Sequence, residues 1–152
     1  MPPTAQASHV QRGLLHPGYG PLLRIVLHHR DSPAKGNTHA LLDTGASMSA
    51  VDKDLAASLG LPSPGYATWK AVTQTEEEHA SALREGGVQF WGNRWVYPVK
   101  LVELPALAHR VEGYTVGVLL GWDFLQNCKL TCDGPANTFT LELPKHRTQR
   151  RR

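Results

Sequence analysis

The chain has 152 residues, of which 41% are hydrophobic and 19% are charged, and its formal net charge is +3. This length is typical of one domain whose core is large enough to fold without disulfides or a structural metal. No stretch approaches the ~20 consecutive apolar residues that cross a bilayer, which excludes a membrane-spanning helix. Because the N-terminus lacks the apolar segment of a secretory signal, we expect a cytoplasmic protein with no membrane partner.

The two ends of the sequence differ from its middle. Residues 1–20 mix Pro, Gly, Gln and His without apolar periodicity, so we expect a flexible N-terminal arm in which no core strand begins. Residues 144–152 form a basic C-terminal tail that holds five of the sixteen Lys and Arg side chains. Such a tail is most often a solvated end, and if the chain binds nucleic acid, we expect only this tail to do so. The folded domain is predicted to span residues 21–143.

The first half of this domain is predicted to contain a hairpin and a helix. Residues 22–27 and 39–42 are strand-like runs that flank a stretch of turn-forming residues, 31–37, so they should pair as a β-hairpin. Residues 52–62 have acids at their start, leucines four apart, and Gly-Leu-Pro at their end. These start and stop signals predict a short helix.

The second half of the domain is predicted to be mostly β. Between residues 66 and 104, aromatic and β-branched residues alternate with polar ones, which predicts several antiparallel strands. Residues 116–121 should form a buried strand, residues 122–127 a single helical turn, and residues 128–143 a closing hairpin. The fold class is therefore all-β with one or two short helices.

The two cysteines of the chain, Cys128 and Cys132, are four positions apart. On one strand their Cα atoms would be ~13 Å apart, beyond the ~7 Å limit for a disulfide. Two thiols without further ligands at zinc-binding spacing also make a poor metal site. We expect reduced core cysteines, and we predict neither a metal nor a cofactor.

The segment most informative about chemistry is Leu-Leu-Asp-Thr-Gly-Ala-Ser at residues 41–47. It places Asp43 at the end of an apolar strand and directly before a polar turn. Thr44 and Ser47 add hydroxyl groups, and Gly45 lets backbone N–H groups approach the carboxylate because it has no Cβ. Such a turn is suited to holding an acid.

A second element, Val-Leu-Leu-Gly at residues 118–121, could pack beneath the turn that carries the acid. Together, residues 42–47 and residues 118–125 resemble the retropepsin-like aspartic proteases, the single-lobed relatives of pepsin. The resemblance covers about residues 21–143. It implies a closed, β-barrel-like fold that acts as a homodimer.

The resemblance also implies an aspartic endopeptidase that hydrolyses peptide bonds in a peptide or protein substrate. This chemistry needs two carboxyls about one water, and the chain has one Asp-Thr-Gly, so Asp43 of each subunit would form the catalytic dyad. Two adjacent carboxyls share one proton, so activity would peak on the acid side. Thr44 would lock the two turns together, and Ser47 would brace Asp43 or its turn. The residues implied in active-site support and in binding substrate backbone are Thr44, Gly45, Ala46, Ser47, Leu120 and Gly121.

Two features depart from the family's pattern. Many viral members have Arg directly after the Gly of the second element and an acid two residues after the catalytic Gly, but here Trp122 and Ser47 occupy these places. The loss of both partners together indicates a concerted alternative. The flap, a hairpin that closes over substrate, should lie between residues 66 and 90, and its tip lacks glycine. The candidate flap residues are Thr73, Gln74, Thr75 and Glu76.

Several alternatives stay open at this stage. Asp43 could belong to an Asx-type turn after a strand, with no chemical role. The chain could be a catalytically silent dimeric module that binds proteins or peptides. His28, His29 and His39 could hold a metal, although surface histidines fit better because the first two point to opposite faces of a strand. The tryptophans could assist nucleic-acid binding, although core packing explains most of them.

Overall fold

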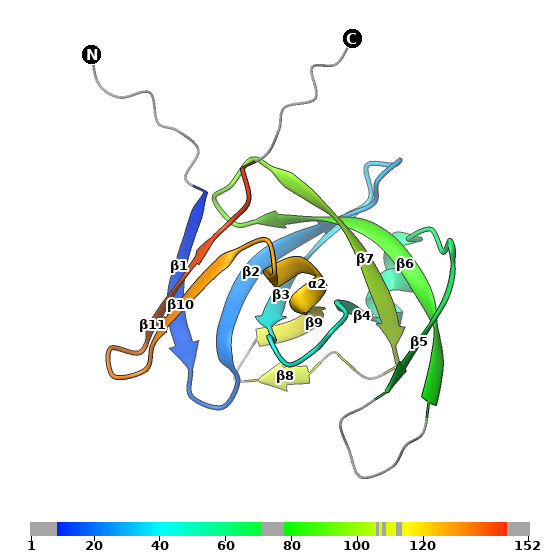
Figure 1. Ribbon diagram of the computed structural model, residues 1–152. Helices are drawn as coiled ribbons and strands as arrows, with labels where there is room; N and C mark the ends of the chain where they lie inside the picture. Colours follow the sequence, from blue (N-terminus) through cyan, green and yellow to red (C-terminus); the bar gives the residue numbers. More distant parts are fainter. Residues whose placement is uncertain (1–8, 71–77, 106, 108, 112–113, 146–152) are drawn as a thin grey trace, which may run out of the picture.

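The computed structural model describes residues 9–70, 78–105, 107, 109–111 and 114–145, and it consists mainly of β-strands (Figure 1). The helices within these residues are short, α1 at Lys53–Leu59 and α2 at Trp122–Leu125, and neither is long and apolar enough to cross a membrane. This composition confirms the predicted all-β class with one or two short helices. The strands are β1 (Val10–His16), β2 (Gly20–His28), β3 (Lys35–Leu42), β4 (Ala50–Asp52), β5 (Gly65–Lys70), β6 (Glu78–Phe90), β7 (Val96–Leu104), β8 (His109–Val111), β9 (Tyr114–Leu120), β10 (Lys129–Asp133) and β11 (Thr138–Glu142).

Six of the strands close into a barrel. In the order β2-β3-β9-β4-β7-β6 each strand is hydrogen-bonded to the next, and β6 pairs back with β2. A closed ring has no free strand edge. The closed, barrel-like sheet that the resemblance implied is therefore present. The interior of the barrel holds fully buried apolar side chains, among them Ile25, Leu27, Val88, Phe90, Leu101, Val118 and Leu120.

The pairing of β3 with β9 positions the two sequence elements that carry the resemblance. The predicted hairpin forms, with β2 and β3 antiparallel, and β3 also runs parallel to β9 with Leu42 opposite Leu120. Because parallel strands have their C-terminal ends at the same edge, the residues that follow the two strands emerge side by side. Asp43 and Gly121 are those residues.

Helix α1 forms where its capping signals predict it. The Asp52 carboxylate accepts the backbone N–H groups of Asp54 and Leu55, at 3.1 and 3.3 Å. Gly60 ends the helix with φ at 60°, in the left-handed region that favours glycine. Local sequence is therefore sufficient to define both ends of this helix.

The N-terminal region differs from the prediction, because β1 occupies part of the expected flexible arm. β1 pairs antiparallel with β11, from Val10↔Glu142 to Leu14↔Thr138, and the order β10-β11-β1 lies at one side of the molecule (Figure 1). β1 forms through backbone pairing with β11, more than a hundred residues away in the sequence. This pairing does not require apolar side chains to alternate along β1, so the local sequence did not predict the strand. The rest of the predicted domain division stays a prediction, and residues 1–8 and 146–152, with most of the basic tail, lie outside the described residues.

The cysteines are both free thiols, but only one contacts the core. Cys128 is half-buried against the core, and this burial raises its pKa to about 11. Cys132 is exposed, contrary to the prediction of two core cysteines. It lies on β10, which pairs with β11 at the end of the sheet, so its side chain faces solvent.

We expect Asp52→Ala to lower the free energy of unfolding by about 1–2 kcal/mol, because two N–H groups of α1 lose their acceptor. Urea denaturation monitored by circular dichroism measures this change. Asp54→Ala is the matched control, since Asp54 is exposed in the first turn of the same helix and should have a smaller effect. Equal unfolding midpoints for the two variants would contradict the role of Asp52 as the cap.

Candidate active site

The turn that carries Asp43 is held by its own backbone. The Asp43 N–H donates to the Leu120 carbonyl at 2.9 Å, and the Ala46 N–H donates to the Asp43 carbonyl at 3.2 Å. The Gly45 N–H donates to Oδ1 of Asp43 at 2.9 Å. Asp43 is half-buried, whereas Thr44 and Gly45 are exposed. The carboxylate is thus fixed from behind and open to solvent on its other side.

The second predicted element packs directly against this turn. The Trp122 N–H donates to the Ala46 carbonyl at 2.7 Å. A Cβ on the buried Gly121 would lie 2.7 Å from the carbonyl oxygens of both Ala46 and Met48. Only glycine permits this approach without a backbone shift. The expectation that Leu120 and Gly121 lie beneath the Asp43 turn is therefore confirmed as geometry.

A hydroxyl and a carboxylate that the sequence analysis missed join the turn to α2. Ser49 is only 1% exposed, and its Oγ donates to Oδ1 of Asp123 at 2.7 Å while its N–H donates to Oδ2 at 3.0 Å. The same Oγ accepts the N–H of Gly121 at 3.0 Å. The Phe124 N–H also donates to Asp123, at 2.9 Å. We call this set of contacts the Ser49–Asp123 brace.

The brace, and not the Ser47 side chain, supplies the side-chain contacts that join the turn to α2. Ser47, predicted to brace the turn, is exposed, and within the described residues its side chain makes no hydrogen bond; its carbonyl accepts the Asp123 N–H at 3.3 Å. The supporting hydroxyl instead comes from Ser49, two residues later, and the acid comes from α2. The signal in the sequence was the second serine of Ser-Met-Ser together with an acid one residue after Trp122.

Asp43 stands apart from the other aspartates. Among the described residues, Asp43 accepts a side-chain hydrogen bond from its own turn alone. Four of the others hold contacts within the fold: Asp31 pairs with Arg30 at 3.5 Å, Asp52 caps α1, Asp123 holds Ser49, and Asp133 accepts the Ala136 N–H, while Asp54 is exposed on α1. Asp43 is therefore the one described aspartate whose carboxylate is held on this turn.

An apolar surface on the barrel leads to the turn. Leu41 lies opposite Leu22 on one side and opposite Leu119 on the other. All three side chains are half-buried, whereas the alternate residues Ala40 and Leu42 are buried inside the barrel. Because side chains alternate along a strand, Leu41 shares its face with position 43. The candidate acid thus stands at the end of an apolar surface.

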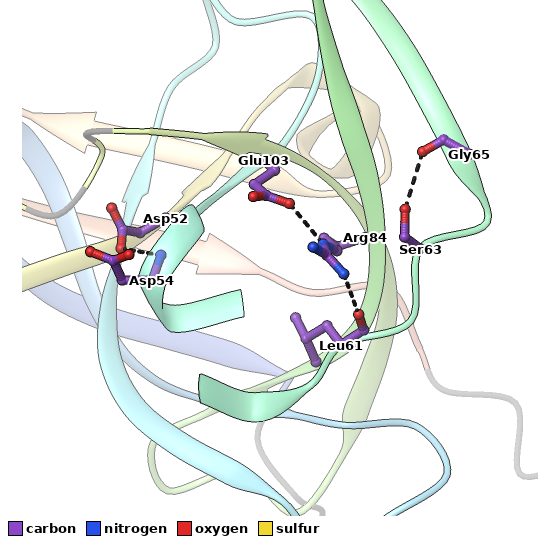
Figure 2. A network of polar contacts seen from close by, with 7 residues as sticks. All are labelled: Asp52, Asp54, Leu61, Ser63, Gly65, Arg84 and Glu103. Atoms are coloured by element: carbon purple, nitrogen blue, oxygen red, sulfur yellow. Dashed lines mark hydrogen bonds and ion pairs between the residues drawn. The ribbon is translucent and has the colours of Figure 1, made fainter. Parts of the chain in front are cut away.

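The predicted flap corresponds to the hairpin of β5 and β6. These strands pair antiparallel from Gly65↔Leu83 to Lys70↔Glu78. The base of the hairpin is fixed by Arg84, whose Nε donates to Glu103 at 2.8 Å and whose Nη1 donates to the Leu61 carbonyl at 2.8 Å (Figure 2). The candidate tip residues, Thr73, Gln74, Thr75 and Glu76, lie outside the described residues.

The three histidines considered for a metal have separate partners. Nε2 of His28 hydrogen-bonds to Gln89 at 2.7 Å, and Nδ1 of His29 accepts the Asp31 N–H at 2.9 Å. His39 packs edge-on against Tyr114, with ring centroids 4.8 Å apart. In the described part of the chain, no three His, Cys, Asp or Glu side chains converge as metal ligands would.

Of the three tryptophans whose side chains the structure describes, core packing accounts for only one, which corrects the sequence-based expectation. Trp95 packs against the core, but Trp91 is 54% exposed and Trp122 is 51% exposed. Phe90 takes the interior position at the end of β6, so Trp91 points outward, where the Arg24 guanidinium lies 3.7 Å from its ring centroid. Trp122 begins α2, whose buried side chain is Leu125.

Comparisons with known proteins give one family model and similar solved structures. A family model described as "Aspartyl protease" matches residues 34–124, which contain the Asp43 turn and Gly121. A solved retropepsin-like aspartic protease from Rickettsia conorii is 18% identical, with 88% of this chain and 93% of that chain covered and a TM-score of 0.45. EIAV protease, solved in complex with the inhibitor HBY-793, is 15% identical, with 70% and 85% covered and a TM-score of 0.42. A search of curated proteins found no match.

We expect Asp123→Ala to destabilise the protein by about 1–3 kcal/mol, because the buried N–H and hydroxyl of Ser49 lose their acceptor. Asp123→Asn keeps one acceptor oxygen and should cost less. Urea unfolding of both variants measures the difference. An alanine variant that unfolds at the wild-type midpoint would show that the brace contributes no stability.

Proposed function

The chain belongs to the aspartyl protease family, and from this membership and the Asp43 turn we propose that it is an aspartic endopeptidase that works as a homodimer. The observation that carries the proposal is the setting of Asp43. Its carboxylate is held by the Gly45 N–H on a turn bonded to Leu120, and it faces solvent beside an apolar surface. Of the other described aspartates, Asp54 is exposed on α1 and the rest hold contacts within the fold.

In the proposed mechanism, Asp43 of each subunit contributes one carboxyl to a dyad about a water. Two carboxyls at hydrogen-bond distance share one proton, because ionising both costs too much. The ionised carboxylate takes a proton from the water as the water oxygen attacks the peptide carbonyl carbon, and the protonated carboxyl donates to the carbonyl oxygen. The tetrahedral diol then collapses as a proton passes to the leaving nitrogen and the C–N bond breaks.

The residues around Asp43 would support this chemistry through their backbone. Thr44 is exposed, so its hydroxyl is free to bond across to the turn of a second subunit. The carbonyl of Gly45 would accept from substrate backbone, which suits an extended peptide. The supporting backbone positions are Ala46, Ser47, Leu120 and Gly121, whose contacts hold the turn in place.

The apolar surface indicates the substrate's character. Leu22, Leu41 and Leu119 lie in register across three strands that lead to the Asp43 turn. Burial of a substrate side chain against them is favourable by about 25 cal/mol for each Å² of apolar area. We therefore propose that large apolar residues next to the scissile bond are preferred.

We expect Asp43→Asn to reduce peptide hydrolysis at least about a hundredfold, because the variant cannot take up or give the proton. Cleavage of a peptide library between about pH 3 and 7, followed by mass spectrometry, tests this, and wild-type activity should be highest on the acid side. Folding and dimerisation should be retained, since the side chain is partly exposed.

Asp54→Asn is the matched control, since Asp54 is an exposed aspartate away from the turn, and it should hydrolyse peptides like the wild type. Full activity in Asp43→Asn would refute the mechanism. A wild-type dimer that cleaves no peptide in the library would favour the silent binding module instead.

We expect Leu119→Ala to lower kcat/KM about tenfold for peptides with a large apolar residue at the cleavage site, and less for peptides with alanine there. Val26→Ala is the control, because Val26 is also half-buried on the outer face but lies farther along β2 from the turn. Equal losses with both kinds of peptide would contradict a specificity role for Leu119.

A further inference from the structure

The exposed indole of Trp122 lies beside the turn that carries Asp43. Its side chain is 51% exposed, although its backbone N–H is fixed to the Ala46 carbonyl at 2.7 Å. Within the described part of the chain, the ring has no aromatic or cationic stacking partner, unlike Trp91, which packs against Arg24. A single exposed apolar residue is ordinary on a protein surface. The informative feature of Trp122 is therefore its location next to the Asp43 turn.

The position matters because the site is incomplete in one protomer. The proposed chemistry needs a second carboxyl within hydrogen-bond distance of Asp43, whose side chain contacts no other aspartate within the described residues. A second copy of the chain must therefore approach the exposed side of Thr44 and Gly45. Since the Trp122 N–H is one hydrogen bond from this turn, Trp122 would lie near the two-fold axis of such a dimer.

We propose that Trp122 is the apolar anchor of the interface with a second copy of this chain. The inference rests on the proposed homodimer and adds the residue that drives its assembly. Large aromatic side chains near the centre of an interface contribute much of its binding free energy. The Ser49–Asp123 brace already holds α2 to the turn within one protomer, so Trp122 is left free for contact between protomers.

An apolar anchor has a distinct salt dependence. An interface that relies on exposed ion pairs weakens as salt screens the charges. Contact through an indole instead depends on removing apolar surface from water, which salt such as sulfate strengthens. The dimer should therefore persist, or tighten, as sulfate is added.

Sedimentation equilibrium of full-length variants tests the anchor directly. We expect Trp122→Ala to raise the dimer Kd at least about tenfold and Trp122→Phe to raise it less. Trp91→Ala is the matched control, with nearly the same exposure but a place away from the turn, and it should dimerise like the wild type. Circular dichroism confirms that each variant folds, and Trp122→Phe serves if the alanine variant does not.

Peptidase assays on the same samples separate this inference from the proposed function. At concentrations that restore its dimer, Trp122→Ala should recover wild-type activity per dimer, because the dyad is intact. A Kd unchanged in both Trp122 variants, or a wild-type chain that stays monomeric at every concentration, would overturn the anchor. A wild-type dimer that weakens in Trp122→Ala but cleaves no peptide would refute the peptidase and leave the anchor standing.

Discussion

The parallel pairing of β3 with β9 is the constraint on which the site depends. It sets Leu42 opposite Leu120 and continues one step further, as the Asp43 N–H donates to the Leu120 carbonyl. Parallel neighbours require a long crossover, and here the crossover contains β4, β6 and β7, which complete the barrel. The same ladder that closes the barrel therefore sets the backbone of the candidate catalytic turn, and Gly121 allows the chain to pass close beneath it.

The Ser49–Asp123 brace shows how the turn is supported without an ion pair. A carboxylate that accepts several N–H and O–H groups is held by charge-assisted hydrogen bonds, which are stronger than neutral ones. Because the Ser49 hydroxyl also accepts the Gly121 N–H, one buried atom connects the turn, the strand end and α2. The position directly after Gly121 then needs no charge, and this chain has an indole there.

Several aspartates of this chain hold contacts within the fold, and this bears on how the proposed reaction could be completed. In the proposed mechanism the second carboxyl comes from Asp43 of another copy, while Asp52, Asp123 and Asp133 hold contacts within the fold, so activity would be tied to assembly. For such an enzyme the dissociation constant of the dimer is also a control on catalysis. The proposed contact through Trp122, next to the Asp43 turn, would couple the two.

The sequence by itself determined what depends on neighbouring residues: the β2–β3 hairpin, the ends of α1 at Asp52 and Gly60, and the Asp-Thr-Gly turn, because caps, turns and alternation are local. Tertiary structure decided the rest. β1 pairs with β11 through backbone bonds that carry no side-chain pattern, and Ser49 meets Asp123 only because the barrel brings β4 to α2. The exposure of Trp122 and Cys132 was likewise set by which neighbours the closed sheet leaves uncovered, and a local pattern does not contain that information.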